Sequence, residues 1–148
     1  MSKPFFRADQ VGSLLRPPEL IQARADFEAQ KIDAAELHAM EDQAIASHVK
    51  RQESCGFQVV VDGEFRRENW WIDFVRGLSG VEIQDGQASQ AFVAPNTNDC
   101  GHDHSHDEGW KYVPKNVITT GKLALPRSVM AGDFKFLQSQ TQRMAKVT

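Results

Sequence analysis

The chain has 148 residues, a mass of 16.6 kDa and a formal net charge of −3 at pH 7, so it fits one ordinary domain. Hydrophobic residues make up 41% and charged residues 25%, which speaks against wholesale disorder and against a membrane protein. A pI near 5.9 gives no reason to expect a nucleic-acid partner, and without a secretory signal the expected location is the cytoplasm.

An extended entry segment is predicted for residues 5–18, because Pro17 and Pro18 forbid a helix before about Glu19. Gly12 allows the backbone to come close to another group. Ser13 offers a hydroxyl and a backbone N–H, which suit a carboxylate or a phosphate held at a turn. The alternative is that this Gly-Ser pair only makes a turn.

Two helices are predicted next, over residues 19–30 and 33–55. The first is weakly amphipathic, and the second begins with a capping box formed by Asp33 and Glu36. His38 and His48 lie in the second helix without a partner four residues away that would make a metal-binding pair, which favours ordinary surface or core-edge histidines over metal ligands. Cys55 is expected to be a buried free thiol at the end of this helix.

A short strand buried on both faces is predicted for residues 57–62, because Val59, Val60 and Val61 form an apolar β-branched run. An acidic loop follows at its carboxyl end. In parallel α/β architectures ligands bind beyond the carboxyl ends of the strands, so Glu64 is the first functional candidate.

The run from Trp70 to Val75 predicts a helix that is too apolar to face solvent. Because it follows directly after a strand end, Trp70 and Trp71 are candidates for the wall of a ligand pocket. The alternative for this aromatic cluster is the protein core.

A polar, irregular insertion is predicted at about residues 84–116, after a short strand at 81–83. It contains the tract CGHDHSHDEG, in which His102, His104 and His106 alternate with other polar residues. These histidines are candidate ligands for zinc or another divalent ion. The alternative is a solvated loop, because structural zinc sites have paired spacing that this tract lacks.

Beyond the insertion, residues 117–121 predict a strand and Pro126 opens a helix that carries Met130, Phe134 and Leu137 on one face. Residues 145–148 predict the start of a further strand. An unpaired strand edge at this point would favour self-association.

Three segments resemble one known family: RADQVGSLLRP (7–17), VVVDGEFRREN (59–69) and GKLALPRSVMAGDFKFLQSQT (121–141). They are similar to the N-terminal part of the catalytic barrel of cobalamin-independent methionine synthases, specifically the single-barrel, methionine synthase II-like relatives. The resemblance implies an α/β fold: the N-terminal part of a (β/α)8 TIM-type barrel, incomplete, with the polar insertion at about 84–116. Residues 1–148 would then form one partial barrel domain with about three of its strands.

The resemblance also implies a function in methionine biosynthesis. Members of the family move a methyl group from a methyl-folate to the thiol of homocysteine, which makes an amino-acid thiol the expected small-molecule partner. In the family the Gly-Ser turn holds the amino-acid carboxylate and the acidic residue of the Gly-Glu motif holds the ammonium group. Carried over to this sequence, these positions are Val11, Gly12 and Ser13 for the carboxylate, and Glu64 for the ammonium group.

Zinc is the cofactor that the resemblance implies, but the family's zinc ligands belong to later strands and match no position here. The chain alone is therefore expected to have no methyl-transfer activity, and no catalytic residue is assigned in it. Two alternatives stay open. One is a coenzyme-M-type thiol lyase on the same barrel, and the other is a non-catalytic protein that binds metal through the histidine tract.

Overall fold

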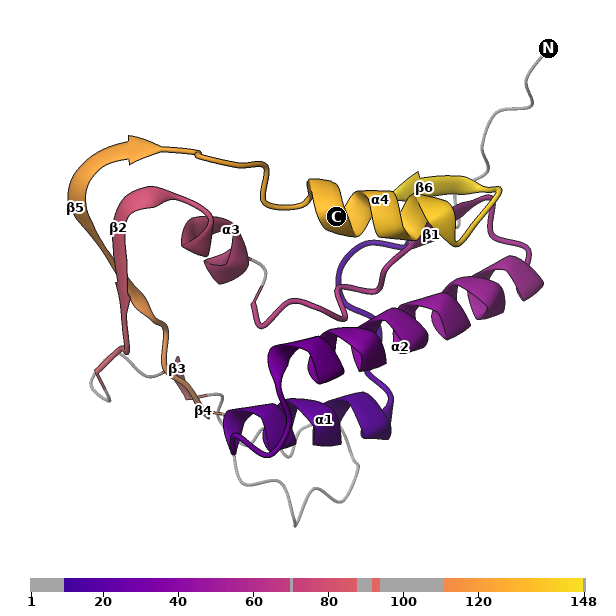
Figure 1. Ribbon diagram of the computed structural model, residues 1–148, viewed down its shortest axis with the longest axis horizontal. Helices are drawn as coiled ribbons and strands as arrows, with labels where there is room; N and C mark the ends of the chain where they lie inside the picture. The colour runs from indigo at the N-terminus through magenta and orange to yellow at the C-terminus, as the bar shows by residue number, and fades with distance from the viewer. Residues whose placement is uncertain (1–9, 70, 88–91, 94–110, 148) are drawn as a thin grey trace. The chain divides into compact units, whose positions relative to one another are not determined.

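The structure is a computed structural model, and it describes residues 10–69, 71–87, 92–93 and 111–147. These residues form two compact units (Figure 1), one drawn from residues 1–73 and 128–148 and the other from residues 74–127. The short helix α3 (Ile72–Arg76) lies where the chain passes from the first unit to the second. Among the described residues, no helix is both long enough and apolar enough to cross a membrane.

The first unit contains three longer helices, α1 (Pro18–Glu28), α2 (Ala34–Ser54) and α4 (Ala131–Ser139). Its two strands, β1 (Val59–Val61) and β6 (Met144–Lys146), pair in parallel. A parallel pair needs a crossover connection, and α4 lies in that connection and contacts β6. The buried core joins all of these helices to β1 and to the turn that follows it. It consists of Leu20, Ile45, Val49, Val60, Phe65 and Leu137.

Helix α2 begins as its sequence predicts. The Asp33 carboxylate accepts hydrogen bonds from the backbone N–H groups of Ala35 and Glu36, both at 2.8 Å. The Glu36 side chain accepts in turn from the Asp33 N–H at 2.9 Å, which completes the capping box. The expected burial of Cys55 is wrong, because this residue is the C-cap of α2 and lies at the exposed end of the helix.

Strand β1 is buried on both faces, as predicted, since Val60 and Val61 are 0% and 1% exposed. One of its edges pairs with β6. On the other edge, the Gln52 side-chain amide forms hydrogen bonds with both backbone polar groups of Val61. Its Nε2 donates to the Val61 carbonyl at 2.8 Å, and its Oε1 accepts from the Val61 N–H at 3.0 Å. The buried end of the strand therefore has its polar groups paired.

The second unit is built on the antiparallel pair of β2 (Ser79–Gln84) and β5 (Asn116–Ala124). Gly80 has a φ of +79° at the bulge in this pair, and the Lys122 carbonyl lies 2.5 Å from where its Cβ would be. A side chain would not fit at this position.

The predicted insertion contains more order than its polar sequence indicates. Within it, β3 (Phe92–Val93) pairs with β4 (Lys111–Tyr112). A ladder of two residues has too few positions for a recognisable alternation, so the sequence pattern missed it. The helix predicted from Pro126 begins at Ala131, because apolar periodicity identifies the buried face of a helix better than its first turn.

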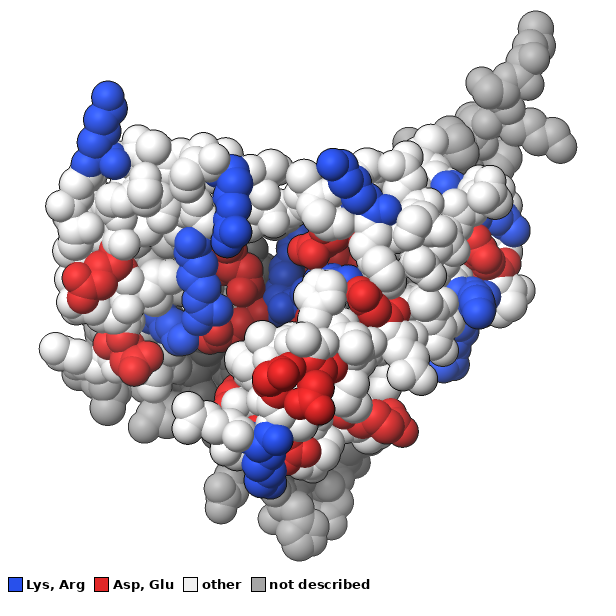
Figure 2. All heavy atoms as spheres, viewed as in Figure 1, with Lys and Arg blue, Asp and Glu red and all other residues white. Residues whose placement is uncertain are grey.

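Acidic and basic side chains both occur over the face drawn in Figure 2, and no large area of a single sign is visible there. This distribution agrees with the small net charge of −3. On this face, the described residues of each unit show no broad basic stripe of the kind that tracks a nucleic-acid backbone.

Candidate functional site

The candidate site is the turn that follows β1, where Asp62, Gly63 and Glu64 are all buried. The Asp62 side chain holds the backbone of Glu64, because the Glu64 N–H donates to Asp62 Oδ1 at 3.1 Å. A carboxylate that remains buried at a strand end needs polar partners. Those of Glu64 include Ser13, from a distant part of the chain, and Arg67, three residues further on.

The backbone of this turn is left-handed at two successive residues, with φ of +70° at Gly63 and +56° at Glu64. At Gly63 a Cβ would lie 2.9 Å from the Phe65 ring and 3.2 Å from the Leu14 Cβ, so only glycine fits without a shift. Glutamate rarely adopts a positive φ, and the conformation costs about 1–2 kcal/mol. The surrounding contacts must therefore hold Glu64 in place.

The entry segment and the turn lie side by side, as the two motifs of the sequence predict. Ser13 Oγ donates to Glu64 Oε2 at 2.7 Å, although the two residues are 51 positions apart in the chain. The Leu14 N–H donates to the Gly63 carbonyl at 3.1 Å. Gly12 has a φ of +85° with open space at its Cβ position, whereas the Val11 side chain is 81% exposed.

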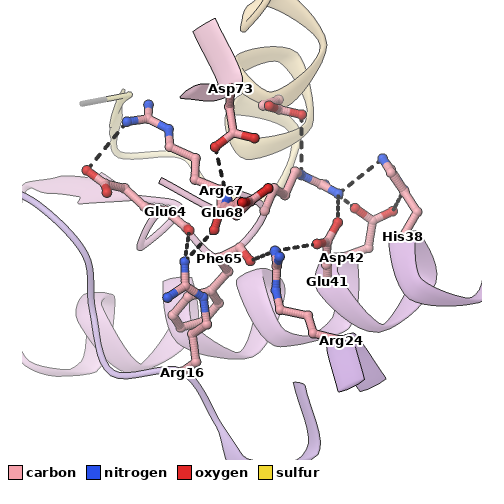
Figure 3. Close-up of polar contacts among 12 residues, drawn as sticks. Arg16, Arg24, His38, Glu41, Asp42, Glu64, Phe65, Arg67, Glu68 and Asp73 are labelled. Atoms are coloured by element: carbon pink, nitrogen blue, oxygen red, sulfur yellow. Dashed lines mark hydrogen bonds and ion pairs between the residues drawn. The ribbon is translucent and has the colours of Figure 1, made fainter. Parts of the chain in front are cut away.

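Two arginines at the turn were not singled out in the sequence. Arg67 Nη1 lies 3.5 Å from Glu64 Oε1. Arg16 Nη2 donates to the Glu64 carbonyl at 2.9 Å and to the Arg67 carbonyl at 2.6 Å (Figure 3). A weak signal was available, since each arginine stands three residues after a motif residue, Ser13 or Glu64.

Burial is the largest influence on the Arg16 guanidinium and lowers its pKa below the usual range; the nearby Arg24 cation acts in the same direction. The carboxylates of Glu64 and Glu41 raise this pKa and oppose the effect of burial. Arg24 itself donates to the Phe65 carbonyl and, at 2.7 Å, to Glu41 Oε1. Arg16 of the entry segment and Arg24 of α1 thus both hold backbone carbonyls of the turn.

Arg66 contacts a different set of partners, on α2 and α4. Its side chain is 8% exposed and forms ion pairs with Glu41 at 3.5 Å, with Asp133 at 3.3 Å, and with Asp42. The Phe136 ring lies 5.0 Å below the guanidinium, which adds a cation–π contact. Burial raises the pKa of Glu41 and of Asp133 above their usual values, and the neighbouring arginines only partly offset it.

The structure describes Trp71 but not Trp70. Trp71 is half-buried, and its backbone N–H donates to Asn69 Oδ1 at 3.4 Å. A role for these indoles as a pocket wall stays a prediction. A separate cavity of about 520 Å³ lies between α1 and α2, and neither Ser13 nor Glu64 lines it.

No group of three or more His, Cys, Asp or Glu side chains is placed to hold a metal ion in the part of the chain that the structure describes. The zinc that the family resemblance implies therefore has no fitting ligand set among these residues, and no chemical step is derived through it. His102, His104 and His106 lie outside the described residues, so metal binding by them stays a prediction.

Comparisons with known proteins give a consistent family. The family model described as "Cobalamin-independent synthase, Catalytic domain" matches residues 6–96. The uncharacterised protein YxjG of Bacillus subtilis is 48% identical over 137 residues, which cover 93% of this chain and 32% of that protein. A 5-methyltetrahydropteroyltriglutamate–homocysteine methyltransferase of Thermosynechococcus vestitus is 29% identical over 136 residues, 92% of this chain and 16% of that enzyme.

Solved structures confirm the fold class. A candidate vitamin-B12-independent methionine synthase from Listeria monocytogenes superimposes with a TM-score of 0.66 at 30% identity, covering 95% of this chain and 34% of that one. A B12-independent methionine synthase from Shewanella superimposes with a TM-score of 0.53 at 23% identity, covering 79% of this chain and 29% of that one. The fold is thus part of a (β/α)8 barrel, and the chain spans about a third of these proteins or less.

Proposed function

The chain belongs to the family of cobalamin-independent synthase catalytic domains, and from this premise we propose that it forms part of the amino-acid subsite of a homocysteine methyltransferase. The reaction would move a methyl group from a methyltetrahydropteroyl-polyglutamate to the sulfur of homocysteine, as the names of its methyltransferase relatives indicate. This chain would contribute groups that bind the amino-acid end of the acceptor.

One observation carries the proposal: Ser13 and Glu64 touch, with their oxygens 2.7 Å apart at the carboxyl end of β1. The ammonium and carboxylate of an α-amino acid are attached to one carbon, so their protein partners must also lie close together. A carboxylate suits the ammonium group, while a hydroxyl at a Gly-Ser turn suits the carboxylate. The contact supplies both in one place.

Binding would rearrange this contact. A ligand ammonium at Glu64 would compete for the carboxylate oxygen that now accepts from Ser13. The Ser13 hydroxyl could then rotate and donate to the ligand carboxylate. The Arg67 guanidinium also lies beside the Glu64 carboxylate, with its Nη1 3.5 Å from Glu64 Oε1, and adds positive charge there.

The zinc ion, the cytoplasmic location and the self-association that the sequence suggests remain predictions. Within the proposal, zinc and the groups that activate the thiol belong to parts of the family's barrel that the described residues do not supply. The role assigned to this chain is limited to binding and orienting the amino-acid end of the substrate.

The test is an NMR titration of L-homocysteine and L-methionine into the ¹⁵N-labelled chain. Glu64→Gln is expected to weaken binding about 10- to 100-fold, because a hydrogen bond to a charged group contributes about 1.5–3 kcal/mol. Glu68→Gln, in the same loop but exposed, is the matched control. A thiol acid of the same length without the ammonium group should not bind.

Equal affinities of the unaltered chain and the Glu64→Gln variant would refute the subsite assignment. So would binding of the ligand that lacks the ammonium group at the affinity of homocysteine.

A further inference from the structure

The conformation of Glu64 requires a support that its own sequence does not supply. Glu64 is buried and has a φ of +56°, which glycine adopts easily and glutamate does not. Gly63, just before it, is also left-handed, so the two residues reverse the chain together. Something outside the turn must keep this arrangement in the folded protein.

Arg16 contacts the turn at both of its ends. Its guanidinium donates to the carbonyl of Glu64 at 2.9 Å and to the carbonyl of Arg67 at 2.6 Å (Figure 3). The Arg67 N–H also donates to the Glu64 carbonyl at 3.1 Å, which closes the turn between the two acceptors. Both bonds come from Nη2, whose two N–H groups have fixed directions in the guanidinium plane, whereas the N–H groups of a lysine ammonium rotate freely.

The contacts of Arg16 extend those of the residues before it. Ser13 reaches the Glu64 carboxylate at 2.7 Å, and the Leu14 N–H reaches the Gly63 carbonyl at 3.1 Å. Side chain and backbone of the Gly63–Glu64 pair are therefore held by one short entry segment. Arg16 is the member of that segment that binds the Glu64 peptide itself.

We propose that Arg16 is a positioning residue that holds the Glu64 peptide in its left-handed conformation and so fixes where the carboxylate meets a ligand ammonium group. The part of this inference that concerns binding rests on the proposed function. The part that concerns the backbone of Glu64 does not. The two parts can be measured separately.

A second arginine of the first unit, Arg143, allows a matched comparison with Arg16. Arg143 Nη1 donates to the Phe57 carbonyl at 3.1 Å, at the opposite end of β1. It is also an arginine bound to a backbone carbonyl, but that carbonyl precedes β1 instead of lying in the turn after it. Arg143→Gln therefore controls for a general loss of stability.

The experiment uses the 148-residue chain with Arg16→Gln, Arg16→Lys and Arg143→Gln, and records backbone ¹³C chemical shifts at Glu64. These shifts report φ and ψ without any ligand. Arg16→Gln is expected to move them away from left-handed values and to weaken homocysteine binding about tenfold. Arg16→Lys keeps the charge but not the fixed N–H directions, so its Glu64 shifts and its affinity should lie between those of Arg16→Gln and the unaltered chain. Arg143→Gln should leave the Glu64 shifts unchanged.

A double variant shows whether Arg16 acts through Glu64. If it does, adding Arg16→Gln to Glu64→Gln produces little further loss of homocysteine binding. Independent, additive losses, or unchanged Glu64 shifts in both Arg16 variants, would overturn the inference. If Glu64→Gln itself leaves binding unchanged, the proposed function fails, while the Glu64 shifts still decide the role of Arg16.

Discussion

Glu64 and Arg66 stand two residues apart in one turn, yet their side chains have different kinds of surroundings. Glu64 contacts a hydroxyl and an arginine, Ser13 and Arg67, beside the entry segment. Arg66 is surrounded by carboxylates of α2 and α4, and an aromatic ring lies against its guanidinium. One turn thus contains the groups proposed to bind an amino acid and, next to them, a charged network that joins helices.

The difference separates the groups proposed to bind an amino acid from the groups that join the turn to the helices. The Arg66 network attaches the turn to the two helices that pack around β1, so it should contribute mainly to stability. The Glu64 group should contribute mainly to binding. Substitutions in the Arg66 network should therefore change stability, and substitutions in the Glu64 group should change binding. Substitutions in the backbone that the two share should change both.

Arg66→Met should have the largest effect and should act on stability. It leaves Glu41 buried without one of its two arginines, and the free energy of unfolding should fall by about 2–4 kcal/mol. That value is discounted because Asp42 and Asp133 are about a third exposed. Urea denaturation measures it, with the exposed Arg51→Met as the control.

Where the Arg66→Met variant is still folded, its affinity for homocysteine should stay close to that of the unaltered chain. A large loss of affinity with unchanged stability would show that the two sides of the turn are not separate.

Gly63→Ala should come next and should affect both properties, because the backbone is shared. A φ of +70° and a ring carbon 2.9 Å from the new methyl group should cost about 2 kcal/mol of stability. Amino-acid binding should weaken as well, since Glu64 follows directly. Gly132→Ala, in α4 with open space at its Cβ position, is the control in the same urea measurement. Unchanged binding in a destabilised Gly63→Ala chain would contradict the shared-backbone argument.

Ser13→Ala should have a smaller effect, confined to the ligand side. A single hydrogen bond contributes about 1 kcal/mol, so losing the Ser13 hydroxyl should weaken homocysteine binding by about threefold to tenfold. Because Ser13 is exposed, stability should change little. The same NMR titration gives the affinity, and a destabilisation like that of Arg66→Met would place Ser13 on the structural side instead.

The smallest expected effect is a pH dependence on the Arg66 side. Burial raises the pKa of Glu41 in the folded chain, whereas a glutamate in the unfolded chain has a pKa of about 4.3. At a pH between the unfolded and the folded pKa, Glu41 of the folded chain holds a proton that the unfolded chain has released. The free energy of unfolding therefore falls as the pH rises through this range. Glu41→Gln should flatten this part of the curve, and urea denaturation at several pH values tests it. A slope that is unchanged in Glu41→Gln would rule Glu41 out as its source.

Local features of this chain were predictable, and long-range partners were not. The capping box of Asp33 and Glu36 depends on residues three apart, and the sequence alone identified it. The strand at Val59–Val61 and the candidate at Glu64 followed from an apolar run and its acidic end. These are patterns that neighbouring residues determine.

The arginines of the turn had no such pattern. Arg16 meets Glu64 across 48 residues, and Arg24 meets Phe65 across 41. Which carbonyl such a side chain reaches depends on how α1 and the entry segment pack against β1, and a single sequence carries no direct record of this packing. For the same reason, the parallel pairing of β1 with β6 could be expected only from the family resemblance.

The Gln52 amide on β1 has a consequence for what the sheet can accept. Val61 turns its N–H and C=O away from β6, and one side chain occupies both of them. A strand that approached this edge would have to break two hydrogen bonds before pairing at Val61. The glutamine therefore occupies the hydrogen-bonding position that a neighbouring strand would use at Val61. It leaves the backbone just beyond, at Gly63, to be met by Leu14 from the entry segment.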